Sequence, residues 1–328
     1  MGVLRAGAAA ADPGAAVRDA LEMDGDRLHL LPEPGLDLSA GGSLRLVGAG
    51  KAAASMAAAA LERLGGRVAG GSITLPHGAG RPLPPLDVWE AAHPVPDIGG
   101  LAGASDALAT ARAAGEGDVL LCLLSGGASS LWAAPAPGLT LSDLQAVTVA
   151  LLRSGAPIEA MNVVRKHLSR IAGGGLARAA RPARVLTLAI SDVIGAGDDA
   201  IGSGPTLPDP TTFADALEVV RRYDVALPAA ALHHLRVGAS GAVAETAKPG
   251  ELDNVLAFRI VLSVREALAG AEEEARRLGY AVRVVSAELT GEARDAGARV
   301  AVEALRARAA GEGPVALLWG GETTVTVR

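Results

Sequence analysis

The fold of this chain is decided by the stretch DVLLCLLSGGASS, which runs from Asp118 to Ser130. Its first half is a nearly continuous apolar run, typical of a strand in a parallel sheet that is covered on both faces. Its second half, residues 125–130, holds only serine, glycine and alanine. Ligands of open α/β sheets bind beyond the carboxyl ends of the strands, so this stretch predicts a binding loop as well as a buried strand.

Strands and helices are expected to alternate on both sides of this stretch. The other expected strands are residues 27–31, 44–47, 71–75, 184–190, 254–262, 281–287, 315–319 and 323–327. The expected helices are residues 15–23 with Asp12 as N-cap, 51–64, 101–114, 141–154, 157–171, 212–223, 264–278 and 291–310. This order predicts α/β architecture with a mostly parallel sheet. The weakly patterned segment 237–253 is a candidate junction, so we expect one domain over residues 1–240 and a smaller α/β domain over residues 241–328.

The bulk composition excludes several classes of protein. The chain has 328 residues, half of them apolar, and a net charge of −6 without a lysine- or arginine-rich tract, so no nucleic acid or anionic membrane is expected as a partner. Its single cysteine, Cys122, excludes a disulfide framework. No apolar run reaches the roughly 18 residues of a membrane span, and no secretory signal is recognisable. We expect a soluble, cytoplasmic protein.

A first candidate site follows the strand at residues 44–47. Gly48, Ala49 and Gly50 permit a tight strand-to-helix turn that lets a ligand approach backbone N–H groups. Lys51 adds a positive charge at the start of the next helix, where the helix dipole already favours an anion. The spacing is not that of a P-loop, and a purely structural turn explains these residues equally well.

A second candidate site is the loop that follows the central strand. Small residues with hydroxyl groups at a helix start form a natural phosphate cradle. The candidate phosphate-binding residues are Ser125, Gly126, Gly127 and Ser129. The loop is not a nucleophile elbow, because its flanking pattern differs.

Two further groups of polar residues complete the candidates. Asp192 follows the strand at residues 184–190, where a carboxylate can bind Mg²⁺, accept a proton from a substrate hydroxyl or cap a turn. Asn162, Arg165 and Lys166 share one face of a helix, which could bind a carboxylate or phosphate or simply be solvated. The histidines lack zinc-ligand spacing. A phosphate cradle, a lysine and an acidic strand end together favour phosphoryl transfer.

Seven motifs in this order resemble the glycerate 2-kinase family, whose members are also called hydroxypyruvate reductases. The motifs are Val47–Ala52, His93–Asp97, Leu124–Ser129, Asn162–Ser169, Ser191–Val193, Gly204–Thr206 and Gly320–Val327. The resemblance implies a Rossmann-like N-terminal domain and a smaller C-terminal α/β domain of the MOFRL type. Because the family continues after the last motif, we expect the second domain to be incomplete and poorly stable in this chain.

The resemblance also implies an activity: transfer of the γ-phosphate of ATP, with Mg²⁺, to the 2-hydroxyl of D-glycerate. Lys51 matches the family's functional lysine, and Asp192 matches a position that binds Mg²⁺ or orients the accepting hydroxyl. Arg165 and Lys166 are then expected to help hold the glycerate carboxylate. Glu322 and Thr323 match the edge of the second domain's contribution to the site.

Two alternatives stay open. An NAD(P)H-dependent hydroxypyruvate reductase would use Gly48 and Gly50 as a dinucleotide loop, but Ala53 breaks the G-x-G-x-x-G pattern and no acidic residue follows at the usual distance. An inactive fragment that binds a nucleotide, a sugar acid or nothing is the second alternative. The sequence sets no oligomeric state, and a homodimer is kept open.

Overall fold

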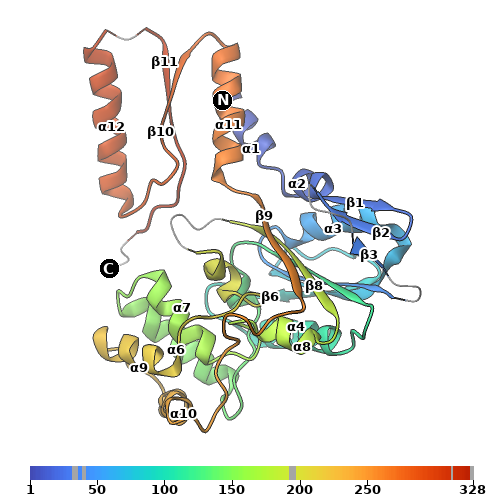
Figure 1. The fold of residues 1–328 in the computed structure, drawn as a ribbon. Coiled ribbons are helices and arrows are strands. Elements are labelled where there is room, and N and C mark those ends of the chain that lie inside the picture. Colours follow the sequence, from blue (N-terminus) through green and yellow to red (C-terminus); the bar gives the residue numbers. More distant parts are fainter. Residues whose placement is uncertain (32–35, 39–41, 192–196, 312, 326–328) are drawn as a thin grey trace. The chain divides into compact units, whose positions relative to one another are not determined.

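The computed structural model describes residues 1–31, 36–38, 42–191, 197–311 and 313–325. The chain forms two compact units (Figure 1). We call the larger one, Val17–Ala189 with Ala196–Val261, the sheet unit. The smaller one, Met1–Ala16 with Ile190–Gly195 and Leu262–Arg328, is the terminal unit. The boundaries of these compact units differ from the predicted domain boundary between residues 240 and 241. That domain boundary stays a prediction.

A six-stranded parallel sheet forms the sheet unit's centre, which confirms the expected α/β class. Its strands, in spatial order, are β6 (Leu86–Ala91), β5 (Val68–Pro76), β4 (Leu44–Ala49), β7 (Val119–Leu124), β8 (Arg184–Ile190) and β9 (Val255–Leu262). When only the strands of this sheet are numbered along the chain, the spatial order is third, second, first, fourth, fifth and sixth, which is the Rossmann order. The switch point of this order lies between β4 and β7.

Helices cover this sheet because its strands are apolar on both faces. All six residues of β7 are buried, and α3 (Ala53–Leu64) and α4 (Ile98–Arg112) pack against β4, β5 and β6. The short connections are η1 (Gly65–Arg67), α5 (Ala128–Leu131), α8 (Gly175–Ala180) and η2 (Asp198–Ser203). Asp97 caps α4 by accepting a hydrogen bond from the Gly100 amide. Because α3 and α4 pack on the faces of the sheet, loops can occupy the carboxyl ends of its strands.

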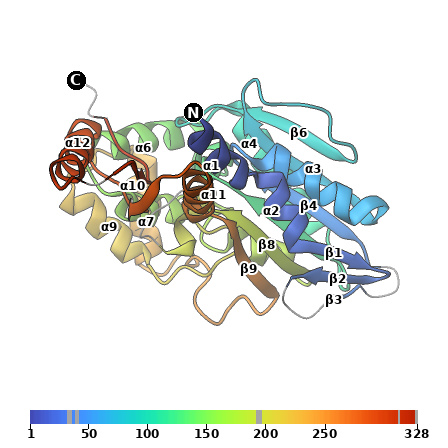
Figure 2. The same cartoon turned by 90° about the horizontal axis from the view of Figure 1, so that it is seen from above.

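Four further helices gather beside the sheet around a second apolar cluster (Figure 2). They are α6 (Leu141–Arg153), α7 (Ile158–His167), α9 (Phe213–Arg222) and α10 (Ala229–Ala239). Capping boxes at Thr140 and Thr212 begin α6 and α9. The sequence analysis missed α10 and extended α7 to residue 171. Asn162, Arg165 and Lys166 all lie within α7, so the prediction that they belong to one helix is confirmed.

A small antiparallel sheet precedes the main one. It consists of β1 (Leu21–Asp24), β2 (Arg27–Leu30) and β3 (Leu36–Asp37). The helix expected to continue to residue 23 ends earlier, because α2 (Pro13–Ala20) gives way to β1. Leu21 is buried and pairs with Leu30, so pairing with β2 outweighs the local helix preference.

The terminal unit joins the first helix of the chain to its last elements. It contains α1 (Gly2–Ala10), α11 (Val264–Arg277), β10 (Ala281–Ser286), α12 (Ala293–Ala309) and β11 (Val315–Trp319). α1 packs against α11 at close range, since a methyl group on Gly7 would lie 2.8 Å from the Ala267 carbonyl oxygen. β10 and β11 form a parallel pair. The strand expected at residues 323–327 extends beyond the described residues, and Thr324 forms a single bridge with Glu292.

Among the described elements, helices α1, α8 and α10 and strands β1, β3 and β6 are additions to the expected pattern. None of the helices in the described ranges is long and apolar enough to span a membrane.

Candidate active site at the switch point

Two loops meet where β4 and β7 end side by side. The amide of Lys51 donates to the carbonyl of Gly126 at 2.9 Å, and the amide of Ser125 donates to the carbonyl of Ala49 at 3.1 Å. The Ser125 hydroxyl oxygen accepts a hydrogen bond from the Ala52 amide at 3.0 Å. The two predicted phosphate loops are thus tied together, at the point where Rossmann sheets bind their ligands.

Gly50 makes this close approach feasible. Its φ of +133° is strained for residues with a side chain, and a methyl group there would overlap the Ser125 hydroxyl and its backbone. Gly50 therefore shapes the cradle, while the groups that face a ligand come from its neighbours.

Gly50→Ala is expected to lower the free energy of unfolding by about 1–3 kcal/mol, through backbone strain and overpacking against Ser125. Urea unfolding measures this loss. Gly138→Ala is the matched control, because Gly138 also has positive φ (+85°) but no atom lies within 4 Å of its added methyl group. If the two variants lose the same stability, overlap with Ser125 is not part of the effect.

Lys51, His93 and Gly127 converge on one side of the cradle. A methyl group on Gly127 would lie 3.2 Å from Cδ2 of His93 and 3.7 Å from Cε of Lys51. Within the described part of the chain, no carboxylate pairs with the exposed Lys51 ammonium. This cation is free to neutralise a bound anion.

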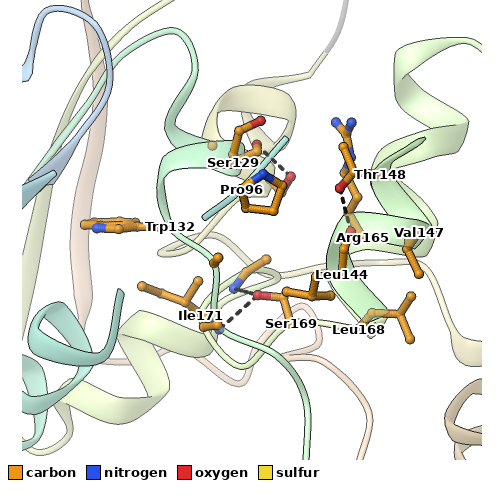
Figure 3. Close-up of a pocket in the computed structure, with 16 residues that line it drawn as sticks. Pro96, Ser129, Trp132, Leu144, Val147, Thr148, Arg165, Leu168, Ser169 and Ile171 are labelled. Carbon is orange, nitrogen blue, oxygen red and sulfur yellow. Dashed lines mark hydrogen bonds between the residues drawn. The ribbon is translucent and has the colours of Figure 1, made fainter. Parts of the chain in front are cut away.

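A small cavity opens beside the end of the same loop. Its volume is about 50 Å³, and it is lined by Ser129, Ser130, Trp132 and Arg165 among others. In Figure 3, Ser129 and Ser169 lie above and below, with Trp132 on the left and Arg165 on the right. A single water needs about 10–15 Å³ of such space, so the cavity suits a small organic acid rather than a nucleotide.

Arg165 supplies the charge of this cavity. Burial lowers the pKa of its guanidinium, yet arginine stays protonated at neutral pH. Among the described residues no carboxylate pairs with it. A guanidinium held in this way can bind a carboxylate through two parallel hydrogen bonds.

Asn162 and Lys166 lie on the buried side of α7. The carbonyl oxygen of Asn162 accepts a hydrogen bond from the Ser203 hydroxyl at 3.2 Å, and Ser203 contacts the Ser129 hydroxyl at 2.9 Å. Lys166 has a side chain only 4% exposed, and its ammonium lies 2.5 Å from Asp199 and 3.5 Å from Asp209. These two predicted residues therefore hold the walls of the site.

Asp209 is the most buried carboxylate of this network. Its oxygens accept hydrogen bonds from Thr211 at 2.7 Å and Thr246 at 3.0 Å. Burial acts to raise the pKa of Asp209, but the Thr211 hydrogen bond and the Lys166 charge hold it below its ordinary value. The carboxylate thus stays ionised opposite Lys166.

The described structure does not test the positions of three predicted site residues. Asp192 lies outside the described residues. Glu322 and Thr323 belong to the terminal unit, where Glu322 is exposed, and their part in the site stays a prediction. No cluster of three metal-binding side chains occurs in the described ranges. Mg²⁺ is often held by only one or two carboxylates together with substrate phosphates, so the residues present fit a metal carried by a nucleotide.

Sequence reasoning missed several residues of this site. His93 belongs to the motif at residues 93–97, a signal that could have assigned it, but its position beside Lys51 and Gly127 was not predicted. Asp199, Ser203 and Asp209 carried no comparable signal, because their partners are distant in sequence.

The strand order and the two joined loops define a Rossmann-like α/β protein, whose small, mostly apolar cavity contains the guanidinium of Arg165. The family described as "Domain of unknown function (DUF4147)" matches residues 1–236. A Pyrococcus horikoshii protein named glycerate 2-kinase is 38% identical over 323 residues, covering 97% of this chain and 72% of that protein. An Agrobacterium vitis protein, provisionally named a hydroxypyruvate reductase, is 42% identical over 285 residues, covering 86% of this chain and 64% of that protein. A crystal structure of a glycerate kinase from Thermotoga maritima matches with a TM-score of 0.81 at 34% identity, covering 99% of this chain and 74% of that one.

The chain therefore belongs to this family, that of the glycerate 2-kinases. It spans about two thirds to three quarters of the length of these relatives.

Proposed function

We propose that this chain transfers the γ-phosphate of ATP to the 2-hydroxyl of D-glycerate, giving 2-phosphoglycerate and ADP. The observation that carries the proposal is the loop of residues 125–130. Its beginning closes the cradle beside Lys51, and its end lines the cavity that holds Arg165. A phosphate donor and a small acid bound at these two places would meet across one short loop.

Lys51 and the loop amides act on the phosphate. In the transfer, the 2-hydroxyl oxygen bonds to the γ-phosphorus while the bond from that phosphorus to the oxygen shared with the β-phosphate breaks, which releases ADP and the hydroxyl proton. Charge builds up on the phosphate oxygens, and an uncommitted ammonium beside them stabilises it. The position of the Lys51 side chain beside Gly127 supports this role.

Arg165 acts on the acid. Its guanidinium lines a cavity of glycerate's scale, where it would bind the substrate carboxylate and orient the 2-hydroxyl toward the cradle. Lys166 was expected to share this contact. Because its ammonium already faces Asp199 and Asp209, we assign it instead to holding α7, and with it Arg165, in position.

ATP and Mg²⁺ belong to the proposal as the phosphate donor and the charge-neutralising metal that such transfers use. We propose Asp192 as the carboxylate that binds the metal or orients the accepting hydroxyl, since it comes two residues after Ile190, the last residue of β8, in the sequence. A cytoplasmic location goes with the use of ATP.

The reductase alternative is disfavoured by the end of β5. In dinucleotide-binding Rossmann domains an acidic residue about 20 positions after the glycine loop binds the ribose. Here β5 ends on Leu75 and Pro76, followed by His77. No carboxylate occupies the ribose-binding position of this strand.

An assay coupled to ADP release tests the proposal. With ATP, Mg²⁺ and D-glycerate, the purified chain is expected to release ADP only when glycerate is present, and phosphorus NMR of the product should place the phosphate on C2. Calorimetry with ATP–Mg²⁺ and with D-glycerate measures binding separately from turnover. Oxidation of NADH by hydroxypyruvate without ATP would replace the proposal with the reductase, and absence of turnover and of both binding heats would contradict any such enzyme.

A further inference from the structure

A second cavity lies in the sheet unit, apart from the cradle. Its volume is about 340 Å³, several times that of the acid cavity, and within the range of pockets that bind small metabolites. It shares only Ser169 and Ala172 with the acid cavity. Neither Lys51 nor any residue of the loop 125–130 lines it. It is therefore a separate hollow, and we call it the basic cavity.

Lysine and arginine outnumber acidic residues in the lining of this cavity, in a chain whose net charge is −6. Its charged lining residues are Arg112, Lys166, Arg170, Arg178 and Glu245. These cations come from separate segments, so no basic tract in the sequence announces them. Burial lowers the pKa of His234 in the wall, so at neutral pH the positive charge rests on the arginines and the lysine.

Several of these charges already have partners. Lys166 pairs with Asp199 and Asp209, and Arg178 pairs with Glu251 at 2.9 Å. Glu245 is bound by Lys248 at 3.3 Å and His167 at 3.2 Å. The carboxylate of Glu245 is thus paired with Lys248 and His167 and not with Arg112 or Arg170.

Arg112 and Arg170 remain uncommitted. Arg112 ends α4 and has no hydrogen-bond or ion-pair partner among the described residues. Arg170 uses Nε to donate to the Pro135 carbonyl at 2.9 Å, which fixes its direction and leaves its terminal nitrogens free of any carboxylate in the described ranges. Two exposed guanidinium groups at one hollow offer the forked donors that phosphate oxygens accept.

We propose that the basic cavity binds a small dianion, either free phosphate or the phosphate group of a phosphorylated small molecule. Arg112 and Arg170 supply the principal contacts. The proposal does not depend on the kinase assignment, because it concerns residues outside the cradle and the acid cavity.

Calorimetric titration of the full chain with inorganic phosphate tests it, at physiological ionic strength. The double variant Arg112→Ala/Arg170→Ala is expected to weaken one phosphate-binding event by at least about tenfold, while ATP binding at the cradle stays unchanged. The matched control is Arg63→Ala/Arg222→Ala, which removes the same charge from exposed arginines of α3 and α9 outside the cavity and should leave phosphate binding unchanged.

A parallel titration with glycerol 3-phosphate distinguishes the two sources. Tighter binding than that of inorganic phosphate identifies a phosphorylated metabolite, and equal or weaker binding identifies the free anion. Unchanged phosphate affinity in the double variant, or equal weakening in the control, would overturn the site. If the double variant unfolds, Arg112→Ala alone decides, because Arg112 has no partner to lose.

Discussion

Lys51→Ala is expected to lower kcat for glycerate phosphorylation by about 100- to 1,000-fold, the range found when one donor to a transition-state anion is removed. The ammonium lies beside Gly127 in the cradle and has no carboxylate partner in the described chain. Its removal should therefore take away charge stabilisation without disturbing packing. Steady-state kinetics and thermal unfolding, measured together, separate these two effects.

Two controls sharpen this test. Lys51→Arg keeps the charge but changes its reach, so it should recover part of kcat. Arg81→Ala removes an exposed cation that contacts the Ala54 carbonyl of α3, and it should leave kcat unchanged. Near-normal turnover by Lys51→Ala would remove Lys51 from the proposed mechanism while leaving the fold assignment intact.

The second large effect is expected from Asp209→Ala, which should lower the free energy of unfolding by about 3–5 kcal/mol, as measured by urea denaturation. Removing one member of a buried ion pair leaves the other charge poorly compensated. Lys166 would keep only the partly exposed Asp199, and Thr211 and Thr246 would lose their acceptor. Because Lys166 and Arg165 are neighbours on α7, KM for glycerate should also rise in the folded fraction.

Asp253→Ala is the control for this variant. Asp253 pairs with Arg181 at the surface, with its side chain 83% exposed, and such pairs contribute about 0–1 kcal/mol. Equal losses in the two variants would contradict the buried-pair interpretation.

Acid should act through the same carboxylate. The pKa of Asp209 lies below its ordinary value of 3.8 in the folded protein, so its contribution is present above pH 3.8 and is lost as the pH falls through the lowered value. On acidification through this range the native chain should lose more stability than Asp209→Ala. Parallel stability curves for the two proteins would show that Asp209 does not carry this pH dependence.

The sheet and the cradle could be predicted because their signals are local. A buried apolar run such as residues 118–124 identifies a parallel strand, and the loop that follows a parallel strand falls at the ligand-binding edge. Gly50, Lys51 and Ser125 were found in this way. Their joining by hydrogen bonds follows from the adjacency of β4 and β7, which local pattern alone does not determine.

The ion-pair network could not be predicted, because its signals are long-range. Lys166 and its partners are 33 and 43 residues apart, and each residue read alone fits a solvated helix or turn. The family resemblance implied a substrate contact for Lys166, where the structure shows a buried ion pair with Asp199 and Asp209. The predicted helix end at residue 23 was wrong for the same reason. The helix ends at Ala20, because the residues after it form β1 by pairing with β2.

The packing of α1 against α11 bears on how this protein is made. At about 5–20 residues per second, α11 leaves the ribosome roughly 10–50 seconds after α1. During that time the small-residue face of α1, centred on Gly7, lacks the helix that covers it. The first five strands of the main sheet can pair as they emerge, whereas α1 must wait for α11, which follows the sixth strand, β9. A bulky fusion ahead of Gly2 should therefore hinder late assembly more than it hinders the sheet.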